Sequence, residues 1–107
     1  MKMVLAIVNH DDAHTVMQKL MREGFSVTKL STTGGFLMSG NVTMLIGVDD
    51  DKVDKVVETI DKASHSRKQM IPTTSELGMG LYPTMPVEVT VGGATLFILN
   101  VERFEKL

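Results

Sequence analysis

The stretch that decides the fold is NVTMLIGVDDDKVDKVVETIDKA, residues 41–63. Its first eight residues alternate between strongly apolar and other side chains, which is the period of a strand with one apolar face. Three aspartates follow, and they can cap a helix. Beyond them, apolar residues recur every three or four positions, the period of a helix that buries one stripe. The apolar stripe consists of Val53, Val56, Val57, Ile60 and Ala63.

A similar unit stands at the start of the chain. Met3–Val8 is a continuous apolar run, and it predicts a strand that is buried on both faces. Residues 9–12, Asn-His-Asp-Asp, offer capping side chains for a helix. Gly24 is a typical stop for that helix, because glycine adopts the left-handed conformation common there. The buried stripe is predicted to be Ala13, Val16, Met17, Leu20 and Met21.

The remaining strands complete an α+β fold. Phe25–Thr32 is rich in β-forming residues, residues 87–91 alternate in polarity, and Ala94–Val101 is predicted as a further strand. Gly92-Gly93 is typical of a tight hairpin. Residues 1–107 are therefore predicted to form a single ferredoxin-like βαββαβ domain, with an added C-terminal hairpin strand. Two helices cover only one face of its antiparallel sheet, so we expect a homo-oligomer that covers the other.

Composition excludes several classes of protein. The 107 residues are 43% hydrophobic and 22% charged, which excludes a disordered chain. Cysteine is absent, so disulfide scaffolds and thiolate sites are excluded. The net charge is −2 without a basic run, which argues against nucleic acid as a partner. No apolar run is long enough to span a membrane and no signal-peptide pattern opens the chain, so we expect a cytoplasmic protein.

Two segments are candidates for binding. The first is the glycine-containing loop at residues 33–40, which carries Phe36 and whose two glycines follow four hydroxylated residues in the segment 28–33. Glycines let backbone amides approach a ligand, and an aromatic ring can stack on a base; a plain turn is the alternative. The second is the long loop at residues 66–86, which holds all three prolines and several methionines. A loop of this length is typical of a ligand or partner loop, or of a loose insertion.

Catalytic and metal sites have little support. His10 and His14 are four residues apart, so a metal pair is geometrically possible, but solvated capping groups are the more common reading. No phosphate-binding loop, nucleophile elbow or HExxH pattern occurs. None of the three arginines, Arg22, Arg67 and Arg103, lies in a glycine-rich loop that could clamp a phosphate. We therefore expect neither an enzyme nor a bound metal or cofactor.

The block TKLSTTGGFL at residues 28–37 and the pair Gly40-Asn41 resemble the PII-like cyclic di-AMP receptors of Gram-positive bacteria (PstA/DarA type). The opening residues, Gly47-Val48, and residues 86–95 resemble this family too, so the resemblance covers essentially the whole chain. It implies a homotrimer of ferredoxin-like subunits that binds cyclic di-AMP in the clefts between subunits. Loop conformation would relay binding to a downstream protein. The residues it implies at the ligand are Thr28, Gly35, Phe36, Leu37, Asn41, Gly47 and Phe97.

Two positions depart from that family pattern. Ser26 stands where family members carry an arginine, and Lys106 stands where they often carry glutamine. Serine cannot replace a planar guanidinium. The departures leave open a sensor for another adenine nucleotide such as ATP. An interaction module that docks a partner through residues 66–86 without any ligand is a further alternative.

Overall fold

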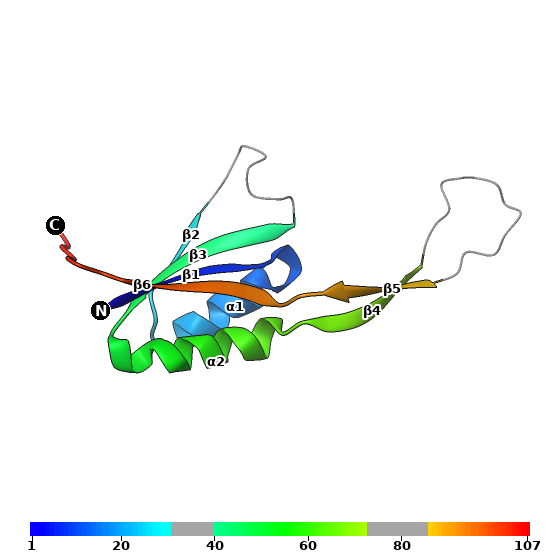
Figure 1. Ribbon diagram of the computed structural model, residues 1–107, viewed down its shortest axis with the longest axis horizontal. Helices are drawn as coiled ribbons and strands as arrows, with labels where there is room; N and C mark the ends of the chain where they lie inside the picture. Colours follow the sequence, from blue (N-terminus) through cyan, green and yellow to red (C-terminus); the bar gives the residue numbers. More distant parts are fainter. Residues whose placement is uncertain (31–39, 73–85) are drawn as a thin grey trace, which may run out of the picture.

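The computed structural model describes residues 1–30, 40–72 and 86–107. Four strands form one antiparallel sheet in the order β2-β3-β1-β6, and both helices lie against one face of it (Figure 1). This arrangement confirms the predicted α+β, ferredoxin-like fold. The elements in chain order are β1 (Lys2–Asn9), α1 (His10–Arg22), β2 (Val27–Leu30), β3 (Asn41–Val48), the 3₁₀ turn η1 (Asp50–Lys52), α2 (Val53–Ser64), β4 (Arg67–Pro72), β5 (Pro86–Val91) and β6 (Ala94–Asn100).

Local sequence accounts for both ends of α1. The side chain of Asn9 accepts a hydrogen bond from the backbone amide of Asp11 at 2.8 Å, which satisfies one of the free donors of the first turn. Asp11 and Asp12 place negative charge at the positive end of the helix dipole. Gly24, with φ +89°, follows the last turn as predicted.

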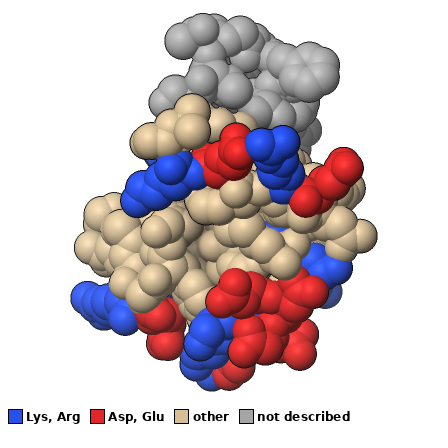
Figure 2. All heavy atoms as spheres, turned by 90° about the vertical axis from the view of Figure 1, so that its left-hand side faces the viewer, with Lys and Arg blue, Asp and Glu red and all other residues tan. Residues whose placement is uncertain are grey.

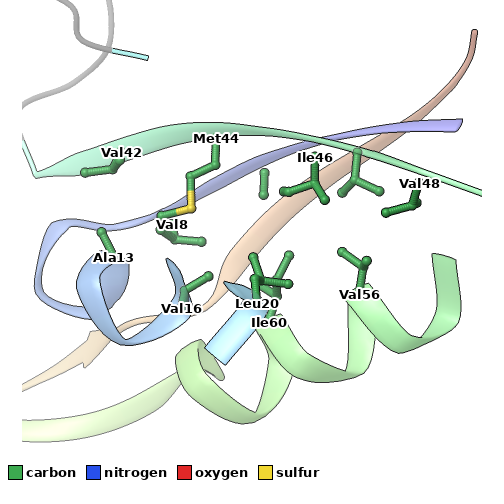
Figure 3. Close-up of a cluster of buried hydrophobic side chains, with 12 residues drawn as sticks. Val8, Ala13, Val16, Leu20, Val42, Met44, Ile46, Val48, Val56 and Ile60 are labelled. Atoms are coloured by element: carbon green, nitrogen blue, oxygen red, sulfur yellow. The ribbon is translucent and has the colours of Figure 1, made fainter. Parts of the chain in front are cut away.

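The hydrophobic core lies between the helices and the sheet (Figure 3). Alternate residues of β1 and β3 point down onto residues of α1 and α2 that recur at helical spacing. Burying one such side chain stabilises the fold by about 1.5–3 kcal/mol. The fully buried members include Val4, Ala6, Met44, Ile46, Val16, Leu20, Val56 and Ile60.

The prediction that β1 is buried on both faces is wrong. Val4, Ala6 and Val8 are buried against the helices, whereas Met3, Leu5 and Ile7 are only half-buried. The second face of the sheet carries no helix in the described part of the chain. The apolar run Met3–Val8 therefore forms a strand that has one face in the core and a second apolar face without a covering helix.

The prediction of a long loop at residues 66–86 is also wrong for the first part of this segment. Residues 67–72 form β4, which pairs with β5 in a separate two-stranded sheet that projects from the body (Figure 1). Residues 67–70 are exposed, so β4 lacks the polarity alternation that reveals a half-buried strand. Residues 73–85 lie outside the described residues.

The sequence predicts a hairpin turn at Gly92-Gly93, and this prediction is wrong. β5 pairs with β4, while β6 pairs with β1, so the two glycines join two different sheets. Both have positive φ, +77° and +85°. The strand that completes the ferredoxin-like sheet is therefore β6, and β5 belongs to the projecting ribbon.

Candidate functional site

The face of the main sheet opposite the helices is strongly apolar. Residues paired across neighbouring strands point to the same face, so the strand registers define its members. Leu30, Phe97 and Leu99 are exposed there, with Phe97 at 51%. A contiguous apolar surface of this kind is typical of an interaction site. The apolar members of this open face are Met3, Leu5, Ile7, Leu30, Leu45, Phe97 and Leu99.

Four of the expected ligand residues lie on this open face. Thr28 on β2 is opposite Leu45 on β3, Leu45 is opposite Leu5 on β1, and Leu5 is opposite Phe97 on β6. Thr28 and Phe97 therefore end one row that crosses all four strands. Asn41 and Gly47 are at even spacings from Leu45 along β3 and so share its face. The other expected residues, Gly35, Phe36 and Leu37, lie outside the described residues.

One chain does not bring these four residues into contact with each other. Thr28 and Phe97 are three strand spacings apart, about 14 Å, and they belong to the two edge strands of the sheet. Asn41 and Gly47 stand at the two ends of β3, about 20 Å apart along the strand. The fold places the four on one surface, but it separates them within a single copy.

A cavity of about 650 Å³ lies at the Gly47 end of this region. Ser26 and Gly47 both line it, which brings the departure from the family pattern beside an expected ligand residue. A Cβ atom on Gly47 would lie 3.3 Å from Cε of Met1, so the absence of a side chain there keeps the cavity open. The Ser26 hydroxyl is too short to replace a guanidinium across such a space.

The charges around this cavity are mixed. Glu23, Asp49 and Asp51 line it together with Lys52 and Lys55. Figure 2 shows this end of the molecule, with acidic side chains gathered below an uncharged band. Carboxylates outnumber the lysines, so the cavity suits a neutral heterocycle better than a phosphate. Lys106, the second departure, is exposed in the irregular C-terminal segment.

Asp12, which lies between His10 and His14, forms an ion pair with Arg67. The Asp12 carboxylate accepts hydrogen bonds from both terminal nitrogens of Arg67, at 3.0 and 3.3 Å. These bonds raise the pKa of the Arg67 guanidinium above its ordinary value. The described residues contain no group of three metal-ligating side chains. Sequence reasoning missed this pair, because no local pattern connects residues 55 positions apart.

This chain is similar to known proteins in fold and in sequence over nearly its whole length. A family model described as "Cyclic-di-AMP receptor" matches residues 1–107. The chain belongs to the cyclic-di-AMP receptor family. A crystal structure of a functionally unknown protein from Pediococcus pentosaceus ATCC 25745 is similar to this receptor-family chain, with 42% sequence identity and a TM-score of 0.76. The match covers 99% of this chain and 96% of that one.

Membership of a receptor family indicates a binding protein and cyclic di-AMP as the ligand class. Neither helix of the described chain is long and apolar enough to cross a membrane.

Proposed function

We propose that this protein is a non-enzymatic, cytoplasmic signal-transduction protein that binds cyclic di-AMP between the subunits of a homotrimer. One observation carries the proposal: Thr28, Asn41, Gly47 and Phe97 come from three strands yet share the open face of the sheet. Family membership over the whole chain supports the identity of the ligand.

The separation of these residues supports a site built from two subunits. Thr28 lies on one edge strand and Phe97 on the other, about 14 Å away. A neighbouring copy that sets its β6 edge beside the β2 edge of the first would bring the two residues together. The same contact would cover the exposed side chains of Leu30 and Leu99, which favours association.

The contacts available to the ligand fit its chemistry. The half-exposed ring of Phe97 offers a stacking surface, worth about 1–3 kcal/mol for one base. The Asn41 amide carries two donors and an acceptor, which match the edge of an adenine. The cavity beside Gly47 is open and carries mixed charge, so we assign it to a base rather than to the phosphates.

In this proposal, a change in loop conformation relays ligand binding to a downstream protein. The ribbon of β4 and β5 projects away from the sheet (Figure 1), where a downstream protein can reach it. Ligand binding between subunits would change the conformation of the loop predicted at residues 33–40 and of the β4–β5 ribbon. A partner protein would then bind or dissociate.

Calorimetric titration with cyclic di-AMP tests the proposal, with ATP and cyclic di-GMP as competing ligands. We expect selective binding of about one cyclic di-AMP per subunit. Phe97→Ala should weaken it about tenfold or more. Phe104→Ala is the matched control, because Phe104 is also exposed but lies in the C-terminal tail. Equal affinity of both variants would refute the site, and silence towards cyclic di-AMP would refute the function.

ATP is the second candidate ligand, and Ser26 is the observation that favours it. Ser26 lines the cavity beside Gly47 in place of the arginine that the family pattern has. If this substitution shifted the preference, the wild type should bind ATP more tightly than cyclic di-AMP. Ser26→Arg should then raise the affinity for cyclic di-AMP, and no gain would remove the reason for this alternative.

A further inference from the structure

Thr43, on β3, is buried on a face of the sheet that is otherwise open. Its side chain belongs to the open face because its neighbours Val42 and Met44 point into the core between sheet and helices. Only 4% of the residue is exposed. The hydroxyl oxygen Oγ1 has no hydrogen-bond partner among the described residues. A threonine hydroxyl can donate one hydrogen bond and accept two, so its full capacity is unused.

An unpaired buried hydroxyl is unfavourable, and native proteins retain few of them. The helices cannot supply the missing partner, because they pack on the opposite face. The cross-strand neighbours of Thr43 cannot supply it through their side chains either, since these are Ile7 on β1 and Leu30 on β2. Within residues 1–30, 40–72 and 86–107, the open face is therefore the side from which a partner can approach.

Thr43 lies among the residues expected to hold the nucleotide. Asn41 is two positions away on the same face of β3, about 7 Å along the strand. Thr28 is a diagonal neighbour across the β2–β3 pair, because Thr28 is opposite Leu45 and Leu30 is opposite Thr43. Diagonal neighbours are about 7–8 Å apart. A base beside Thr43 can reach one of these two neighbours, but not both, because Thr28 and Asn41 are about 14 Å apart.

We propose that Oγ1 of Thr43 makes a hydrogen bond to the base edge of the nucleotide and so contributes to recognition of adenine. This inference rests on the proposed function and names a further residue of the same site. The apolar side chains of Ile7 and Leu30 flank the hydroxyl, so a charged phosphate would be poorly solvated there. A base edge carries both ring nitrogens and an amino group, and a hydroxyl can pair with either.

Two substitutions at this position separate recognition from packing. Thr43→Val replaces the hydroxyl by a methyl group of similar size, and Thr43→Ser keeps the hydroxyl. We expect calorimetry to give an affinity for cyclic di-AMP that is about tenfold weaker for valine and within about threefold of wild type for serine. The melting temperature of the unliganded valine variant should not fall, because an unpaired buried hydroxyl is removed.

Thr59→Val is the matched control. Thr59 is also buried, on α2, and its hydroxyl donates to the backbone oxygen of Lys55 at 2.8 Å. This variant should bind cyclic di-AMP with wild-type affinity. Light scattering on all variants shows whether the hydroxyl instead serves a neighbouring subunit.

Wild-type affinity of Thr43→Val would overturn the inference and leave the proposed function standing. A weaker affinity that comes with loss of the oligomer would overturn it too, because the hydroxyl would then serve assembly. If the wild-type chain itself does not bind cyclic di-AMP, the proposed function fails, and this inference fails with it.

Discussion

Asp12 and Arg67 tie the projecting ribbon to the body of the protein. Asp12 lies almost buried in the first turn of α1, and Arg67 is the first residue of β4. Two hydrogen bonds join the carboxylate to the guanidinium, at 3.0 and 3.3 Å. The guanidinium also donates to the backbone oxygen of His65 at 3.3 Å. The pair therefore connects α1, the end of α2 and the base of the ribbon.

The two partners of this ion pair should differ in importance. Asp12→Asn keeps one acceptor and leaves Arg67 free to turn towards water, so we expect a loss of about 1 kcal/mol in the free energy of unfolding. Arg67→Met should be more destabilising, because it leaves a carboxylate desolvated at the helix start without its partner. Chemical denaturation measures both values. If Asp12→Asn were the more destabilising change, the guanidinium, and not the carboxylate, would be the group that is costly to leave without its partner.

Gly92 should not accept a side chain. An added Cβ would lie 2.5 Å from Nη1 of Arg67, 2.9 Å from the backbone oxygen of His65 and 3.2 Å from Oδ2 of Asp12. Gly92→Ala should therefore destabilise the protein by more than about 1–3 kcal/mol, the strain of positive φ alone. Gly24→Ala is the control, because Gly24 has φ +89° with nothing within 4 Å. Equal losses in both variants, measured by denaturation, would contradict the crowding at Gly92.

Gly47→Val should block the ligand without unfolding the protein. Even a Cβ there would lie 3.3 Å from Cε of Met1, and the branched methyl groups would extend into the adjoining cavity. The end of the Met1 side chain is flexible, so we expect little change in melting temperature. The affinity for cyclic di-AMP should fall about tenfold or more. Undiminished binding by the valine variant would place the ligand away from this cavity.

Leu99→Glu should dissociate the proposed homotrimer. Leu99 is exposed on the open face, in the cross-strand row with Met3 and Gly47. A carboxylate there is harmless in a monomer but would be desolvated in an interface between copies. Light scattering should show the mass falling to that of a single chain, 11.7 kDa. Met70→Glu, at an exposed methionine of the ribbon, should leave the mass unchanged. An intact oligomer in Leu99→Glu would exclude this face as the interface.

The Glu58–Lys62 pair on α2 predicts a small dependence of stability on pH. The hydrogen bond from Lys62, at 2.7 Å, lowers the pKa of Glu58 below its ordinary value of 4.5. A carboxylate with a lowered pKa stabilises the fold above its unfolded pKa, and this contribution is lost as pH falls through the folded pKa.

Glu58→Gln should therefore melt slightly below wild type at about pH 7, and the difference should shrink at the most acidic pH at which the protein stays folded. Because the pair is exposed, about 1 M salt should shrink the difference as well. Thermal melts at both pH values measure it, and a difference that grows on acidification would contradict the assigned sign.

Much of the fold follows from local sequence. The alternation in residues 41–48 and the helical spacing after the three aspartates predict β3 and α2 in the right places. The expected aspartate cap of α2 is wrong, because neither Asp49 nor Lys52 makes a side-chain capping hydrogen bond. The Asn9 cap and the Gly24 stop bound α1 as expected. These features depend on residues within one or two turns of one another, so the order of side chains along the chain reveals them.

The candidate site depends partly on sequence and partly on tertiary structure. The residues themselves came from a family resemblance, and strand periodicity alone shows that Asn41, Thr43 and Gly47 share a face. Which face this is depends on the helices: Val42 and Met44 pack beneath them, so the other side is left open. Sequence did not single out Thr43, because the burial of its side chain is a property of the folded domain.

By itself, the sequence determined the two strand–helix units, both ends of α1 and the apolar character of both faces of β1. Only the tertiary structure decided that β4 and β5 form a separate ribbon, that Gly92-Gly93 joins two sheets, and that Asp12 binds Arg67. Each of these depends on partners that are far apart in the chain. Local patterns carry no record of such partners, because pairing is chosen by packing of the whole domain.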